Sequence, residues 1–243
     1  MVAHWYRPSG WLGRMRLLRG RFRGKGAVGG MSPFPVAGSP ETTPPGPGSN
    51  SLWLRPRACI RVMRKESETR MSAPQIMKIY KFPEPVLREQ AEPVEDIDDE
   101  LRKLIDDMGE TMYAAPGIGL AANQVGEPLQ LLVYDLTPRD QERNLCVLMN
   151  PEIVSAEGEI IYDEACLSVI DFSAEVKRHA MVKVRGFDRH GKPVDIEAEG
   201  LMAICLQHEI DHLKGKLFID HISSLKRALY KRRLQKMLKN EKD

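Results

Sequence analysis

The sequence lacks any long apolar run. No stretch approaches the roughly 18–20 consecutive apolar residues of a membrane-spanning helix, and there is no secretory leader of the usual kind. Its four cysteines, at positions 59, 146, 166 and 205, show no spacing typical of a disulfide framework. We therefore expect neither a membrane protein nor a secreted disulfide scaffold, and a reducing compartment, the cytoplasm, fits best.

Tryptophan is also missing after residue 70, because all three tryptophans lie in residues 1–70. That segment holds 13 Lys and Arg against 3 Asp and Glu, with no acid before Glu41, and it is rich in proline and glycine. Its apolar content is too low to offset chain entropy, so we predict a disordered basic arm. Three interpretations of the arm stay open: a start codon set upstream of the true start at Met71 or Met77, a transit peptide for an organelle, or a nucleic-acid-binding arm.

Residues 71–243 have the size of one ordinary domain. Apolar residues recur at helical spacing from Leu101 to Met112, and Pro116-Gly117 is a stop signal. Further helices are expected around 201–213 and at 224–239. Short apolar or alternating runs predict strands at 129–134, 146–149, 160–162, 182–185, 194–196 and 217–219. This order predicts an α+β fold, with antiparallel sheets around a central helix and a C-terminal helix.

The central helix carries the sequence Gln207-His-Glu-Ile-Asp-His212, which contains an H-E-x-x-H motif. Residues four apart lie on one face of a helix, so His208 and His212 can bind the same divalent metal ion. The carboxylate of Glu209 is then placed to accept a proton. The apolar residues before the motif indicate a buried helix, where unpaired charged groups would be costly. We therefore interpret the motif as part of a metal site.

A third ligand is needed to complete such a site. Metzincin proteases supply a histidine six residues after the motif, but this chain has Phe218 there. A glutamate further along the chain would have to be Glu241, in a charged tail, and His221 belongs to no matching pattern. Cys166, in Glu164-Ala-Cys-Leu-Ser168, is the best candidate because a metal-bound thiol loses its proton. A small buried cysteine without a metal is an equally good interpretation of spacing alone.

A second unusual segment is Gly117-Ile-Gly-Leu-Ala-Ala-Asn-Gln124. It is no dinucleotide-binding fingerprint, because it follows a helix and lacks the last glycine. Its two glycines indicate a close backbone approach, with an extended ligand as one candidate and a simple helix end and turn as the other.

Together, the segments 117–124, 164–168 and 207–212 resemble the three signature motifs of the peptide deformylase family, in the same order and at compatible distances. The resemblance covers about residues 77–235. It implies a metal ion bound by Cys166, His208 and His212, with ferrous iron as the usual ion and zinc or nickel as substitutes. It also implies that Glu209 acts as general base and acid, while the Gln124 amide and the Leu167 backbone N–H stabilise an oxyanion.

The implied reaction is hydrolysis of the N-formyl group from nascent peptides that begin with formylmethionine, releasing formate. We expect Ile118, Gly119 and Glu164 to contact the substrate. Because they precede His208 by seven, four and three residues, Leu201, Ile204 and Cys205 are expected to form an apolar wall for the methionine side chain, or else part of the ordinary core.

Two residues depart from the family pattern, which usually has glycine before the cysteine and proline four residues after it. Here these positions hold Ala165 and Ile170. The ligands and the base are intact, so we expect altered substrate fit and retained catalysis.

Two alternatives of another class are a zinc metalloprotease of the H-E-x-x-H type and a non-catalytic metal-binding module. The tail helix carries eight Lys and Arg against two acids from Ser223 to Asp243. It is either a solvated face or a surface for ribosomal phosphates. We expect no membrane partner and no specific DNA partner.

Overall fold

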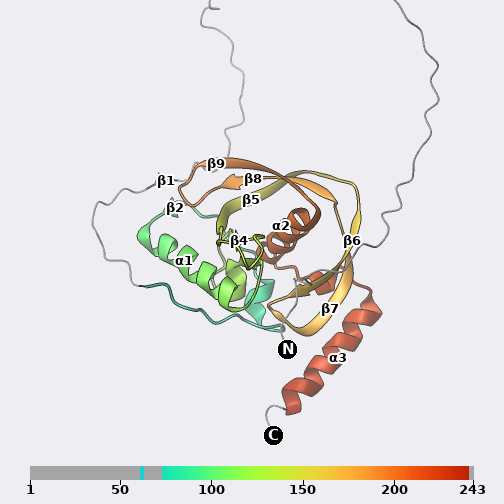
Figure 1. The fold of residues 1–243 in the computed structure, drawn as a ribbon. Helices are drawn as coiled ribbons and strands as arrows, with labels where there is room; N and C mark the ends of the chain where they lie inside the picture. Colours follow the sequence, from blue (N-terminus) through green and yellow to red (C-terminus); the bar gives the residue numbers. More distant parts are fainter. Residues whose placement is uncertain (1–60, 63–72, 241–243) are drawn as a thin grey trace, which may run out of the picture. The chain divides into compact units, whose positions relative to one another are not determined.

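The computed structural model describes residues 61–62 and 73–240 (Figure 1). The prediction that residues 1–70 form a disordered arm lies almost entirely outside the described residues. The exception is strand β1, Arg61–Val62, which pairs in parallel with β2, Asp96–Ile97.

Helix α1 runs from Asp99 to Ala114, as its apolar periodicity predicts. The side chain of Asp98 caps its first turn by accepting a hydrogen bond from the Leu101 amide at 2.8 Å. Its buried face packs against the main sheet, with Ile105, Met108 and Met112 fully buried. Burial of this apolar stripe fixes α1 on the sheet.

The main sheet is antiparallel and has five strands in the order β3-β4-β5-β8-β9. Strand β3, which follows α1 in the chain, lies at one edge of this sheet and pairs with β4. A separate two-stranded sheet, β6-β7, is formed by the hairpin that carries Cys166. The strand bounds are β3 Gly119–Ala121, β4 Leu131–Tyr134, β5 Cys146–Glu157, β6 Ile160–Cys166, β7 Val169–Arg178, β8 Met181–Phe187 and β9 Pro193–Glu199.

Helix α2, Gly200–Leu213, lies between the strands and is buried over most of its length (Figure 1). It contacts β3, β4, β8 and β9 and shares an apolar cluster with the main sheet. It ends where Gly215 adopts a φ of +68°, at a point where an added Cβ would lie 2.4 Å from the Arg88 carbonyl oxygen. Only glycine fits this stop.

A third apolar cluster joins the β6-β7 sheet to helix α3, Ser224–Asn240. Tyr230 and Leu234 are the buried residues of α3, and the Tyr230 ring stacks on Phe172 with their centroids 4.5 Å apart. Most other residues of α3 are exposed, and Figure 1 shows the helix projecting from the remainder of the domain.

The α+β prediction is confirmed, with antiparallel sheets, a central motif helix and a C-terminal helix. One predicted strand is wrong: the apolar run at 217–219 forms the 3-10 turn η3, Phe218–Asp220. The Asp220 carboxylate accepts a hydrogen bond from the Leu217 amide at 2.9 Å, and this bond closes the turn. Two more 3-10 turns, η1 Pro85–Arg88 and η2 Ala122–Val125, were not predicted. Strands β2, β3 and β7 were not predicted either.

Within the described residues, no helix is both long enough and apolar enough to span a membrane.

Candidate metal centre

His208 and His212 lie one turn apart on α2, and both are almost completely buried. Their ring centroids are 5.0 Å apart. Burial holds the pKa of His212 well below its usual value, which favours the neutral imidazole that a metal requires.

Cys166 lies at the end of β6 and faces these histidines. Its Sγ is 3.2 Å from His212 Nε2. The ligand atoms of Cys166, His208 and His212 all lie within 4.8 Å of one another, and no other group of His, Cys, Asp or Glu among the described residues meets this criterion. Tetrahedral bonds of about 2.3 Å to sulfur and about 2.0–2.1 Å to nitrogen would separate the donors by roughly 3.5 Å. The three side chains therefore fit one metal ion in both chemistry and spacing.

The rival third ligands lie elsewhere or cannot bind. Phe218 is buried and stacks on the His208 ring at 6.1 Å between centroids. His221 Nε2 is 2.8 Å from a carboxylate oxygen of Asp211. Glu241 lies outside the described residues.

Glu164, on β6, contacts the imidazole ring of His208. Its Oε2 is 2.7 Å from His208 Nδ1, and this contact fixes the orientation of the ring. Arg178, at the end of β7, donates to both oxygens of Glu164, from Nε at 2.7 Å and from Nη2 at 3.1 Å. Burial alone would raise the pKa of Glu164, but the bonds from His208 and Arg178 lower it, so the carboxylate stays ionised.

The expectation that Glu164 contacts the substrate does not fit this arrangement. Its side chain is fully buried and both of its oxygens are engaged by the protein. Sequence reasoning overlooked Arg178 because an arginine that ends an alternating strand is normally read as exposed.

Glu209 follows His208 on α2 and is buried beside β3. An added Cβ at Gly119 would lie 2.4 Å from Glu209 Oε1, so the backbone of β3 passes directly against this carboxylate. Glu209 Oε2 has no hydrogen-bond partner in the part of the chain that the structure describes. Burial raises the pKa of Glu209 to about 7, which suits a group that takes up and releases a proton near neutral pH.

The Gln124 side chain, in η2, is oriented by its own backbone. Its Oε1 accepts a hydrogen bond from the Ala121 amide at 2.9 Å, so the NH₂ end points the other way. This Nε2 lies 3.1 Å from Ser168 Oγ and 3.6 Å from Cys166 Sγ. A hydrogen-bond donor is thereby aimed at Cys166, one of the three possible ligands.

Backbone bonds from the segment 80–82 tie the first two motifs together. The Tyr80 amide donates to the Gln124 carbonyl at 2.7 Å, and the Phe82 amide donates to the Ser168 carbonyl at 2.8 Å. Lys81 Nζ donates to the Leu167 carbonyl. Sequence reasoning missed this segment, since backbone hydrogen bonds leave no signature in residue type.

The predicted apolar wall is only partly assembled. Ile204 and Cys205 are each 1% exposed, and Cys205 Sγ lies 3.7 Å from the Ile118 carbonyl. Leu201, by contrast, is 37% exposed at the start of α2. The close backbone approach expected around Gly117 and Gly119 is present. Gly117 lies against the Leu167 side chain, and Gly119 lies against Glu209.

The sequence matches the family model described as polypeptide deformylase over residues 76–228. A peptide deformylase of Syntrophobacter fumaroxidans is 56% identical over 164 residues, which is 68% of this chain and 96% of that protein. The crystal structure of a peptide deformylase from Legionella pneumophila superposes with a TM-score of 0.64 at 48% identity, over 68% of this chain and 97% of that one. The crystal structure of an Ehrlichia chaffeensis peptide deformylase in complex with actinonin superposes with a TM-score of 0.63 at 36% identity. The match covers 67% of this chain and 98% of that one.

Proposed function

Since the chain belongs to the polypeptide deformylase family, whose enzymes remove N-formyl groups from nascent chains, we propose that Cys166, His208 and His212 hold the catalytic metal ion beside Glu209. The family assignment makes the chain a hydrolase and disfavours a zinc metalloprotease. The observation that carries the residue assignment is the buried group of three possible ligand atoms next to Glu209, whose Oε2 has no hydrogen-bond partner among the described residues.

A divalent ion held by these ligands would lower the pKa of a water molecule and polarise the formyl carbonyl. Glu209 then accepts the proton of the attacking water as the oxygen bonds to the formyl carbon. The same carboxyl returns that proton to the departing amine when the carbon–nitrogen bond breaks. Formate and a free N-terminus result, and Glu209 returns to its starting state.

The formyl oxygen gains negative charge during the attack. The Gln124 Nε2 and the Leu167 backbone N–H are the proposed donors to this oxygen. Gln124 needs no rearrangement because its other end is already bound to the Ala121 amide. Donors that are aimed before the reaction stabilise the transition state more than the ground state.

The substrate is proposed to lie in extended form along β3. This strand is at the edge of the main sheet, so it can offer backbone groups of Ile118 and Gly119 to a peptide. Ile204 and Cys205 lie on the same side of α2 as His208 and would bound the methionine side chain. Leu201 is more exposed than these two residues, so it would contact a substrate only at the rim of this wall.

Anaerobic measurement of formate release from a formyl-Met peptide tests this function. The wild type is expected to be active with iron or nickel, Glu209→Gln to bind metal without turnover, and Cys166→Ala to lose the metal. Wild-type protein that contains the metal and releases no formate would refute the assignment. Normal metal content in Cys166→Ala would remove Cys166 from the ligand set.

Ferrous iron is the proposed physiological ion, with zinc and nickel able to replace it. A thiolate with two imidazoles suits any of these borderline ions, so availability in the cell selects among them. Metal analysis of protein purified without oxygen, beside a sample exposed to air, distinguishes them. Activity that is stable in air would argue for zinc or nickel.

Helix α3 is proposed to contact ribosomal RNA. It carries seven Lys and Arg and no acid, and most of these side chains are exposed. Deletion of residues 224–243 would also remove Tyr230 and Leu234 from the core. Reversal of Lys231, Arg232 and Lys236 to Glu is the sharper test. Ribosome affinity of this variant at low salt should fall, while charge reversal of Lys183 and Arg185 on β8 should change the affinity little. An equal loss of affinity in the two variants would refute the proposed role of α3.

We propose that residues 71–243 form the catalytic domain, with residues 1–70 as a separate extension. The family match begins at residue 76, in keeping with this division. The cytoplasm is the proposed compartment, and the unpaired Cys146, Cys166 and Cys205 suit its reducing conditions. Sequencing the N-terminus of the cellular protein and locating a C-terminal fluorescent fusion would distinguish this from an organelle.

A further inference from the structure

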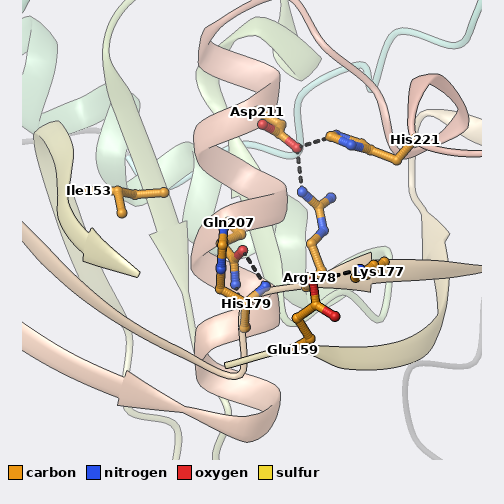
Figure 2. A pocket seen from close by; sticks show the side chains of 8 residues that line it. All are labelled: Ile153, Glu159, Lys177, Arg178, His179, Gln207, Asp211 and His221. Atoms are coloured by element: carbon orange, nitrogen blue, oxygen red, sulfur yellow. Dashed lines mark hydrogen bonds and ion pairs between the residues drawn. The ribbon is translucent and has the colours of Figure 1, made fainter. Parts of the chain in front are cut away.

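A second face of α2 is lined by charged side chains that the reaction does not use. Figure 2 shows a pocket lined by Ile153, Glu159, Lys177, Arg178, His179, Gln207, Asp211 and His221, with a volume of about 340 Å³. Gln207 and Asp211 each precede a metal-binding histidine by one residue. The pocket and the metal centre therefore lie against adjacent faces of the same two turns of helix.

Most polar groups of this pocket bind one another. Arg178 Nη1 donates to Asp211 Oδ2, and His221 Nε2 lies 2.8 Å from the same oxygen (Figure 2). Gln207 Nε2 donates to the His179 carbonyl at 2.9 Å, while its Oε1 accepts from the His179 amide at 3.0 Å. The wall of the pocket is thus a connected hydrogen-bonded structure.

This structure continues inward to the metal centre. Arg178 uses Nε and Nη2 for the two oxygens of Glu164, and Glu164 holds His208 Nδ1. Side-chain exposure rises outward along the chain, from 0% for Glu164 and 5% for Arg178 to 16% for Asp211 and 34% for His221. One chain of charge-assisted bonds therefore connects a metal ligand with the surface.

We infer that Arg178 and Asp211 are positioning residues of the metal centre, which act through Glu164 to hold His208 in its metal-binding orientation. The inference rests on the proposed metal ligands. Glu164 is buried without access to water, so it stays ionised and fixed only while a cation faces it. The planar guanidinium supplies two parallel bonds to Glu164 and a third to Asp211, which a lysine cannot reproduce. Asp211 in turn fixes the plane of the guanidinium.

The test is metal affinity, measured in metal-free protein titrated with Co²⁺ and followed by its visible absorption spectrum. Outer partners of metal-bound histidines typically contribute about 10–100-fold to affinity. We expect Arg178→Met to weaken Co²⁺ binding by about tenfold or more, because it removes the hydrogen bonds that hold Glu164 against His208. Arg178→Lys should resemble Arg178→Met more than the wild type. Asp211→Asn should have a smaller effect, and His221→Gln the smallest.

Lys177→Met is the matched control. Lys177 lies beside Arg178 on the pocket rim, and its ion-pair partner among the described residues is Glu159, with both side chains more than 60% exposed. Its loss should leave Co²⁺ affinity and the spectrum unchanged. A loss of affinity in Lys177→Met equal to that in Arg178→Met would overturn the inference, because it would show a general effect of charge.

Melting temperatures separate positioning from a purely structural role. A positioning role predicts that the stabilisation gained on adding Co²⁺ is smaller in Arg178→Met than in the wild type. Equal lowering of the metal-free and metal-loaded melting temperatures, with unchanged affinity, would overturn the inference. If Arg178→Met does not fold, Asp211→Asn decides by the same two measurements. Failure of the wild type itself to bind Co²⁺ would instead refute the proposed function.

Discussion

Gly119→Ala isolates the contact between β3 and the proposed base. The added Cβ would lie 2.4 Å from Glu209 Oε1, whereas ordinary van der Waals contact begins at 3.4 Å. The carboxylate or the strand must therefore move by about 1 Å. The backbone of Gly119 is not in the left-handed region, so alanine adds no strain of its own there.

A misplacement of about 1 Å at a reacting group can cost on the order of 100-fold in rate. This corresponds to about 2.7 kcal/mol of transition-state stabilisation. We expect kcat for formate release to fall by about this factor. The three atoms nearest to the added Cβ all belong to Glu209, so metal content is expected to stay at the wild-type level.

Gly109→Ala in α1 is the matched control. Its Cβ would meet the end of the Leu145 side chain at 2.5 Å, a similar overlap far from the base. Turnover in this variant should be unchanged. A Gly119→Ala enzyme with kcat within threefold of the wild type would refute the proposed role of this close approach.

Three further predictions concern the pH profile, the docking of α3 and the substrate cleft. Glu209 must be ionised to accept a proton, and its pKa is raised to about 7. We therefore expect kcat/KM to fall about tenfold per pH unit as the pH drops below about 7. A pH profile of kcat/KM that is flat down to about pH 5 would contradict this. Tyr230→Ala removes a buried ring stacked on Phe172 and should lower the free energy of unfolding by about 3–5 kcal/mol, measured by urea denaturation, with Leu229→Ala as an exposed control expected to change little. Ala165→Gly removes the methyl group that departs from the family pattern on β6, and it should change KM for formyl-Met peptides while metal affinity stays constant; identical KM values would show that this methyl does not face the substrate.

Local sequence patterns were sufficient for the three α-helices and for the presence of strands β8 and β9. The apolar repeat from Leu101 to Met112 and the alternation at 182–185 each determine a buried face by themselves. The run at 217–219 misled because three apolar residues fit a strand and a buried turn equally well. The Asp220 side chain, which closes that turn, decided between them.

The sequence by itself determined the two histidines, the adjacent carboxylate and their common helix, because a spacing of four residues sets one helical face. It left Cys166 as a candidate, since the distance between a strand end and a helix face depends on how the two pack. Only the tertiary structure brought Cys166 within 3.2 Å of His212 and engaged the oxygens of Glu164 with His208 and Arg178. Contacts between residues distant in sequence leave no local pattern, so only the folded chain decides them.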